Sequence, residues 1–305
     1  MTPMPELRDL PDGLTERPLR LGDSGAITEV MAAQELEDAG AVMIDEAYIV
    51  GDWQKPSFDL ATSTVGVFDG ERLVAYAEVS GADRGDAAVH PEYRGRGIGT
   101  ALAQWMQDTA RAKGSTVIGM AVPVGSPGET LLTSLGYRPR WNSWVLSLPE
   151  GKVIEEQPLA DGYAVGEATE DQWPATHTVL EDAFLEWARR ERESWADFSA
   201  QVMQRPGFEP WNVRVATDAS GEVVGASLVF VDNLGVGYVD RIAIRRDQRN
   251  LGLARALLAD SFTVARAHGA RTSELGTDSR TGALTLYEKV GMEVTSNWVN
   301  LAIDL

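Results

Sequence analysis

The stretch RGRGIG at residues 94–99 returns as RNLGLA at residues 249–254, 155 positions later. The same spacing relates Gly136 to Gly291, whereas residues further upstream correspond at a spacing of 150. This change indicates a short insertion in the second copy, between the strand at Val223 and the second stretch. We therefore interpret the chain as a divergent tandem duplication in which each copy carries a basic, glycine-containing turn.

The length of the chain and its midpoint agree with this duplication. A chain of 305 residues fits two domains of ordinary size. Residues 148–152, LPEGK, combine proline and glycine, which is typical of a linker. We predict an N-terminal domain over residues 1–150 and a C-terminal domain over residues 151–305.

The composition argues against several kinds of site. Cysteine is absent, and His90, His177 and His268 have no metal-binding spacing, so we expect neither a thiol nucleophile nor a metal site. The net charge of −19 argues against nucleic-acid binding; it suits a cationic small substrate, or serves solubility alone. Because no stretch has the length and apolarity of a membrane span or a signal sequence, we expect a cytoplasmic protein with no membrane partner.

Hydrophobic periodicity and turn residues predict the same order of elements in both copies. Hairpins followed by a glycine turn and a helix favour an α+β fold, in which each domain is a mixed, mostly antiparallel sheet flanked by helices. The predicted helices are 24–37, 46–53, 97–109 and 128–135, then 173–194, 251–268 and 281–290. The predicted strands are 14–21, 63–68, 72–79, 86–89, 117–122 and 141–148, then 162–167, 212–217, 222–231, 238–244, 272–277 and 294–303.

The glycine turn of each copy has the features of an anion-binding site. A strand ending at Val89 or Ile244 is followed by a basic residue, small residues and the start of a helix. Backbone N–H groups and the positive helix end then point at one place, where a diphosphate fits. The sequence lacks the GK[ST] of a Walker loop, and its glycines are not spaced as in a dinucleotide-binding turn.

The pattern [R/Q]xxGx[G/A] after a strand resembles motif A of the GNAT superfamily of acyl-CoA N-acyltransferases. The segment LYEKVGM at residues 286–292 resembles a helix end of the same family. The resemblance implies acetyl-CoA as cosubstrate, no metal, and a fourth and fifth strand that splay apart to admit pantetheine. It implies cofactor contacts by Val89, Arg94, Gly95, Arg96, Gly97, Ile98, Gly99 and Thr100 in one copy and by Ile242, Ala243, Ile244, Arg249, Asn250, Leu251, Gly252, Leu253, Ala254 and Arg255 in the other.

The resemblance also implies catalytic roles in the second copy. Tyr287 would protonate the departing thiolate, although packing between helix and sheet explains the same residue. Its counterpart Leu132 cannot donate a proton, so we predict that the first copy is catalytically silent and either binds CoA or is a structural half that completes the substrate cleft. Asp240 is the candidate base, or else forms a salt bridge with a basic neighbour; a bulge is expected there. A backbone N–H near 242–244 would polarise the thioester carbonyl.

The segment from His177 to Trp195 occupies the place where the family shapes its acceptor pocket. Glu181, Phe184 and Trp187 are candidate substrate contacts there, because an acid holds an ammonium group and aromatic rings hold its apolar body. A solvated helical face with a buried stripe accounts for the same residues.

These observations together predict an N-acetyltransferase that moves the acetyl group of acetyl-CoA to a primary amine of a small molecule, with catalysis in the C-terminal domain. Acetylation of proteins or peptides is an alternative, and a noncatalytic acyl-CoA-binding regulatory module is an alternative of another class. A monomer is favoured over a homodimer, because fusing two similar domains replaces a dimer.

Overall fold

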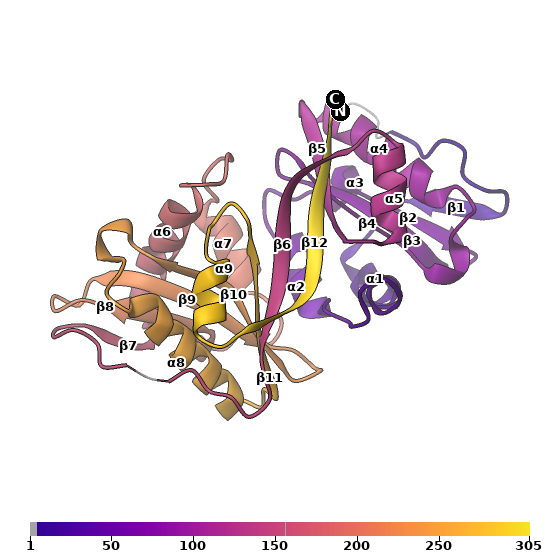
Figure 1. Ribbon diagram of the computed structural model, residues 1–305. Helices are drawn as coiled ribbons and strands as arrows, with labels where there is room; N and C mark the ends of the chain where they lie inside the picture. The colour runs from indigo at the N-terminus through magenta and orange to yellow at the C-terminus, as the bar shows by residue number, and fades with distance from the viewer. Residues whose placement is uncertain (1–4, 156) are drawn as a thin grey trace. The chain divides into compact units, whose positions relative to one another are not determined.

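The computed structural model describes residues 5–155 and 157–305. The chain forms two compact units (Figure 1). The N-terminal unit contains the chain up to Asn142 together with Gln204–Pro206 and Asn297–Leu305. The C-terminal unit contains Ser143–Met203 and Gly207–Ser296. Within the described residues, no helix combines the length and apolarity that crossing a bilayer requires.

The N-terminal unit is built on a mixed sheet in the order β1, β2, β3, β4, β5, β12. Its pairs are antiparallel except for β4 with β5. The strands are β1 (Leu14–Arg17), β2 (Thr64–Asp69), β3 (Arg72–Ser80), β4 (Arg84–Val89), β5 (Val117–Pro123) and β12 (Glu293–Asp304). The helices are α1 (Ser24–Ala39), α2 (Glu46–Trp53), α3 (Leu60–Ser63), α4 (Ile98–Ala112) and α5 (Pro127–Ser134), with short 3-10 turns η1 (Leu21–Asp23) and η2 (Pro91–Tyr93).

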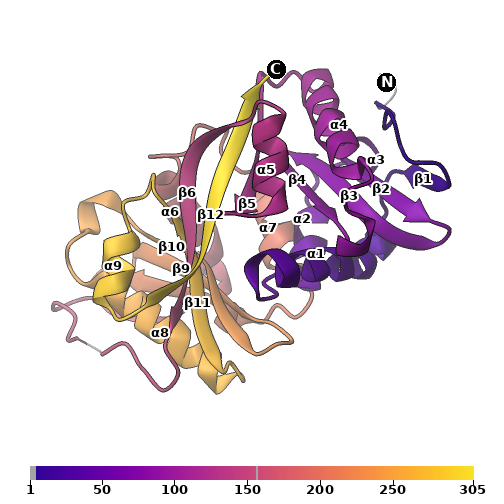
Figure 2. The ribbon, with the colours of Figure 1, turned by 45° about the vertical axis from the view of Figure 1, so that its right-hand side comes forward.

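Helices cover both faces of this sheet (Figure 2). Ile27 of α1 and Trp53 of α2 pack with Tyr76 on one face. Leu102 and Met106 of α4 pack on the other face, at the apolar spacing that predicted this helix. The functional cavity described below lies between these two layers of helix.

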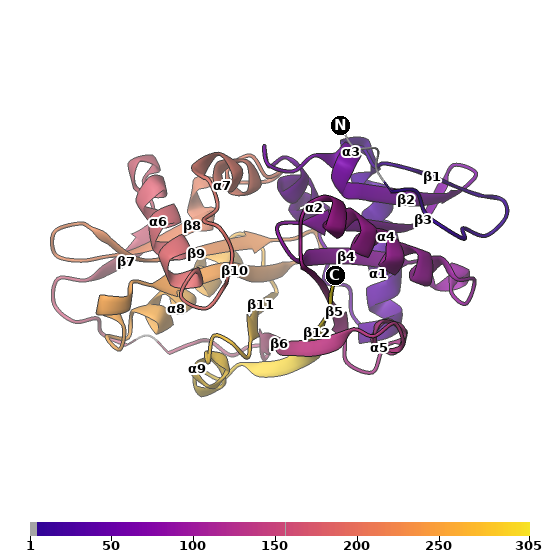
Figure 3. The same cartoon turned by 90° about the horizontal axis from the view of Figure 1, so that it is seen from above.

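The C-terminal unit repeats the plan in the order β7, β8, β9, β10, β11, β6. Figure 3 shows α6 and α8 on opposite sides of β9 and β10. The strands are β6 (Arg138–Leu148), β7 (Ala164–Glu167), β8 (Val213–Thr217), β9 (Val223–Val231), β10 (Val236–Ile244) and β11 (Thr272–Asp278). The helices are α6 (Trp173–Phe184), α7 (Trp195–Val202), α8 (Leu253–Ala267) and α9 (Leu284–Lys289), with 3-10 turns η3 (Glu170–Gln172), η4 (Pro210–Asn212) and η5 (Arg246–Gln248).

The predicted helix over residues 173–194 is wrong in its second half. The helix α6 ends at Phe184, and α7 begins after Ser194, whose hydroxyl accepts a hydrogen bond from the backbone N–H of Asp197. A serine that caps a helix start in this way competes with continuation of the preceding helix. The residues between the two helices form a loop that side-chain ion pairs hold in place.

The domain boundary predicted near residue 150 needs a correction, because the two closing strands are exchanged. Residues 143–148 of β6 pair with β11 of the C-terminal unit, and residues 298–304 of β12 pair with β5 of the N-terminal unit. Leu301 is fully buried in the N-terminal core and Leu146 in the C-terminal core. Since these leucines are equivalent in the repeat, each strand fits either sheet edge, and the sequence pattern alone does not choose between them.

The parallel pair at the centre of each unit separates along its length, as predicted. The pairing of β4 with β5 is confined to Arg84 and Gly119. The pairing of β10 with β11 runs from Val236 to Val239 and then stops. The glycine turns follow the ends of β4 and β10, so each turn lies at the open end of a gap between two strands.

Candidate functional site

The two turns have the same backbone conformation. Gly95 and Gly97 have φ values of +74° and +87°, and Asn250 and Gly252 have +65° and +78°. Asparagine tolerates this left-handed region better than most residues, so its replacement of glycine preserves the turn. Gly97 and Gly252 are the N-caps of α4 and α8, and neither helix start receives a side-chain cap within the described chain. The first-turn N–H groups are therefore oriented for an anion.

Arg94 and Arg249, which occupy equivalent positions in the two turns, are each held by a carboxylate. Arg94 donates two hydrogen bonds of 2.8 Å to Asp38 of α1. Arg249 donates to both carboxylate oxygens of Glu186, at 2.6 and 3.0 Å. Arg96 lies over the ring of Tyr93 instead. These contacts differ from the expected diphosphate contacts: the arginine side chains anchor the turns, and the backbone N–H groups are the donors that face outward.

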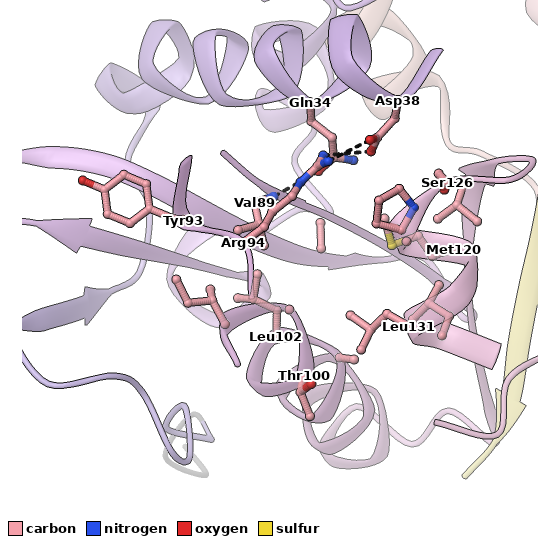
Figure 4. A pocket seen from close by; sticks show the side chains of 18 of the residues that line it. Gln34, Asp38, Val89, Tyr93, Arg94, Thr100, Leu102, Met120, Ser126 and Leu131 are labelled. Atoms are coloured by element: carbon pink, nitrogen blue, oxygen red, sulfur yellow. Dashed lines mark hydrogen bonds and ion pairs between the residues drawn. The ribbon is translucent and has the colours of Figure 1, made fainter. Parts of the chain in front are cut away.

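A cavity of about 360 Å³ lies in the gap of the N-terminal unit (Figure 4). All the cofactor contacts predicted for this copy line it except Arg96. Sequence reasoning missed Gln34, whose side chain accepts a hydrogen bond of 3.0 Å from Val89 N, and Met120 of β5. Nothing in the sequence pattern of α1 marks Gln34, because its role arises only when the helix packs over the gap. The mostly apolar walls and the turn at the mouth suit a pantetheine arm with its diphosphate.

The cofactor contacts predicted for the second copy lie at the end of β10 and the start of α8. Leu253 is 1% exposed, as is its counterpart Ile98, so at these two positions only the backbone is available to a ligand. Leu251 is exposed, and Arg255 donates from Nε to the carbonyl of Glu155. The turn itself therefore presents main chain, as in the first copy.

Tyr287 lies on α9, in the core of the C-terminal unit. It belongs to the same buried cluster as Val239 and Leu275, which lie on the two strands that separate beyond this pair. Burial raises the pKa of Tyr287 to about 12, so the phenol stays protonated at neutral pH. The equivalent Leu132 on α5 lines the cavity of the N-terminal unit. Tyr287 and Leu132, the pair in which the two copies were predicted to differ, therefore lie on equivalent helices of the two units.

Asp240 lies at a bulge in β10, where such a bulge was expected. Val239 pairs with Val229 and Arg241 with Leu228, which leaves Asp240 as the extra residue. Its Oδ2 lies 3.5 Å from Nε of Arg241, so the salt-bridge alternative is confirmed. As a base for the reaction, Asp240 stays a prediction.

Glu181 does not have the position expected of an ammonium-binding residue. Its side chain is 2% exposed, and it accepts hydrogen bonds of 2.6 and 2.8 Å from Arg190 and one of 2.8 Å from Glu193 N. Burial opposes ionisation, but these hydrogen bonds hold the pKa of Glu181 below its usual range. The carboxylate is occupied in holding the loop that follows α6.

The aromatic candidates lie in and beside the same loop. Phe184 packs against the core below α6, and its ring centroid is 5.3 Å from that of Trp187. The guanidinium of Arg280 stacks on Trp187 at 4.6 Å. Arg280 belongs to the segment that leads into α9, so Trp187 links the loop after α6 to that segment.

Known proteins share this sequence pattern and this fold. The model of the acetyltransferase (GNAT) family matches residues 31–129 and 172–292. A mycothiol acetyltransferase from Salinispora arenicola is 28% identical over 257 residues, which are 78% of this chain and 80% of the relative. A GCN5-related N-acetyltransferase from Sphaerobacter thermophilus has a TM-score of 0.74 and 25% identity, with 97% of this chain and 96% of that one covered.

A tandem GNAT protein from the clavulanic acid biosynthesis pathway shares the fold as well. Its TM-score is 0.70 at 19% identity, and the match covers 95% of this chain and 98% of that one. The family model covers most of both copies, each with its own turn and its own separated strands. The chain belongs to the acetyltransferase (GNAT) family and is a tandem N-acetyltransferase.

Proposed function

We propose that this enzyme transfers the acetyl group of acetyl-CoA to a primary amine of a small molecule, and that this reaction takes place in the C-terminal unit. The observation that carries the proposal is the buried phenol of Tyr287 on α9, which belongs to the same core cluster as Val239 and Leu275 of the two strands that separate. The relatives named mycothiol acetyltransferase support a small-molecule acceptor.

Cofactor binding in this unit uses the main chain. The diphosphate of CoA meets the first-turn N–H groups of α8, and the pantetheine arm enters between β10 and β11. Past Val239, β10 pairs only with β9, so one backbone edge of residues 242–244 faces the gap. An N–H on that edge polarises the thioester carbonyl.

The acyl transfer then proceeds by direct attack. The amine nitrogen bonds to the thioester carbon, the carbon–sulfur bond breaks, and the amide forms. Tyr287 donates its proton to the departing thiolate, and the amine proton passes to Asp240, directly or through water.

The test is release of free CoA by the purified chain with acetyl-CoA and a panel of small primary amines. Tyr287→Phe should lower kcat at least tenfold and leave the Kd for CoA within twofold, because only the phenol is removed. Tyr137→Phe is the matched control, since Tyr137 is also buried but lies in the core of the N-terminal unit.

Three results would contradict the proposal. An unchanged kcat in Tyr287→Phe removes the C-terminal assignment. CoA binding without turnover on any amine favours a noncatalytic module. Faster transfer to peptide amino termini than to every small amine favours protein acetylation.

A further inference from the structure

The strands β10 and β11 form a fork whose two faces carry different side chains. Their pairing ends at Val239 and Leu275, which belong to the same buried cluster as Tyr287. Side chains alternate along a strand, so Tyr238 points to the other face. Phe230, which pairs with Tyr238 from β9, is buried in the cluster of α6 and α7, and this confirms the face. The fork therefore has a phenol on each face.

The side chain of Tyr238 leans toward the open end of the fork. In the parallel register Tyr238 is level with Glu274. Its Oη nevertheless lies 2.7 Å from where a Cβ on Gly276 would be, two residues further along β11. Gly276 is the first residue of β11 after the last pair with β10. The hydroxyl of Tyr238 is therefore at the point where the gap between the two strands opens.

Gly276 leaves room for this hydroxyl and for a ligand beside it. The next nearest atoms to an added Cβ are the carbonyl oxygen of Trp144 at 3.9 Å and Cζ of Tyr238 at 4.0 Å, which are ordinary contacts. The φ of Gly276 is not positive, so no turn requires a glycine there. A glycine inside a strand often marks the close approach of another group. Gly276 is exposed and Tyr238 is partly exposed, so a molecule in solution reaches both.

The charged groups beside Tyr238 leave this place open to an amine. Arg241, the cation further along the same face of β10, donates to Glu193 at 2.8 Å, so its charge is balanced. Glu274 accepts a hydrogen bond from Ser147, and its carboxyl group has further lone pairs to offer. An ammonium group that approaches Tyr238 therefore meets hydrogen-bond acceptors and no unbalanced positive charge from Arg241.

We propose that Tyr238 contacts the acceptor amine in the C-terminal unit and sets which amines fit there. Its hydroxyl, held over Gly276, accepts a hydrogen bond from an N–H of the amine and turns the nitrogen toward the thioester, from the face opposite Tyr287. It takes no proton, so the reaction steps stay those of the proposed function. The inference rests on that function and adds the acceptor contact that the buried Glu181 does not supply.

The experiment is a double-mutant cycle on Tyr238 and Gly276. Tyr238→Phe removes only the hydroxyl. Gly276→Ala displaces it, because a Cβ and an Oη cannot stay 2.7 Å apart. Each change should raise KM for the amine about tenfold, as the loss of one hydrogen bond to a charged group does, and leave KM for acetyl-CoA within about twofold. The double variant should lose no more than Tyr238→Phe, since alanine fits once the hydroxyl is gone.

The probes are 1,4-diaminobutane, 2-aminoethanol and tyramine. Steady-state release of CoA gives both KM values, and calorimetry with CoA-saturated protein gives the Kd of each amine without any turnover. The amine that the wild-type protein prefers should lose the most affinity in Tyr238→Phe, because it makes the best contact with the hydroxyl.

The matched control is Gly166→Ala. Gly166 is a strand glycine of the same unit, in β7, and no atom lies within 4 Å of a Cβ added there. Its replacement should change neither KM value. Thermal unfolding of every variant checks the fold. A fall in the melting temperature with equal changes in both KM values would mean that Tyr238 only supports the sheet, which overturns the inference.

The outcomes are distinct from those of the proposed function. A tenfold loss of kcat in Tyr287→Phe, with KM and Kd for the amine unchanged in Tyr238→Phe, overturns this inference while the proposed function stands. Additive losses in the double variant also overturn it, since the two residues would then not act through one hydroxyl. An unchanged kcat in Tyr287→Phe, with weaker amine binding in Tyr238→Phe, supports the acceptor contact and removes the role of Tyr287.

Discussion

The two units share a turn and a gap between strands but differ in what surrounds the gap. The N-terminal unit has Leu132 on α5 and Asp86 on β4, whereas the C-terminal unit has Tyr287 on α9 and Arg241 at the position in β10 that corresponds to Asp86. Arg241 is engaged by Glu193 at 2.8 Å. The two copies thus differ in the side chains around the gap, while the conformation of the glycine turn is common to both.

The anchors of the two turns differ in burial, although both are arginine–carboxylate pairs. The side chain of Asp38 is 5% exposed, whereas that of Glu186 is 32% exposed. Asp38 belongs to a helix, while Glu186 belongs to the loop after α6. The N-terminal turn is thus fixed to a rigid element, and the C-terminal turn to a loop that also carries the acceptor candidate Trp187.

The largest expected difference between the units comes from blocking one turn at a time. Gly252→Trp should lower the Tyr287-dependent rate more than a hundredfold, whereas Gly97→Trp should leave it within threefold. The positive φ strains tryptophan similarly at both positions. Steady-state rates and calorimetric CoA binding measure these effects.

The matched control for that pair is Gly70→Trp, in an exposed turn with a φ of +61°. It introduces the same backbone strain at a position outside the cavity of the N-terminal unit and should leave the Tyr287-dependent rate unchanged. Equal losses in Gly97→Trp and Gly252→Trp would show that the units do not work separately.

The next largest expected effect is on stability, and it tests the exchange of β6 and β12 between the two units. Leu301→Ala and Leu146→Ala should each lower the free energy of unfolding by about 2–5 kcal/mol, because each removes a fully buried side chain. In hydrogen exchange, Leu301→Ala should speed exchange in β3 to β5 and Leu146→Ala in β9 to β11. The exposed Leu36 supplies the control, Leu36→Ala. Faster exchange in β9 to β11 for Leu301→Ala would contradict the exchange of strands.

The smallest expected effect is also on stability, and it compares the two ion pairs that hold the turns, Arg94 with Asp38 and Arg249 with Glu186. Asp38→Asn should lower the free energy of unfolding by about 2 kcal/mol, since its carboxylate is nearly buried against Arg94. Glu186→Gln should cost less than about 1 kcal/mol, because its pair is more exposed and screened by salt. Denaturant unfolding at low and high salt measures both. A larger loss in Glu186→Gln would mean that the loop, and not α1, carries the stronger anchor.

The features predicted from sequence are those that nearby residues determine. Glycine or asparagine at the left-handed positions, followed by an apolar helical pattern, defined the turns at Gly97 and Gly252 without any long-range information. The hairpin at Asp69 and Gly70 followed from the same local reasoning, whereas the splayed central strands were implied by the resemblance to the GNAT superfamily. Comparison of the two copies also identified Leu132 and Tyr287 as equivalent.

The features that sequence reasoning missed depend on contacts between distant residues. Arg94 and Asp38 are 56 positions apart, and Glu181 is engaged by Arg190 only because the helix stops at Phe184. The placement of Tyr238 over Gly276 arises only when β10 and β11 pair, and no motif marks it. The exchange of β6 and β12 escaped prediction because two similar strands compete for two similar edges.

The exchanged strands also affect how this protein is made. The edge of β5 stays unpaired until residues 297–304 leave the ribosome, after roughly 10–30 s of further synthesis. An open edge is a template for pairing with other chains, so the nascent protein has a period of aggregation risk. A deletion within residues 298–304 therefore disturbs the half of the enzyme that is translated first.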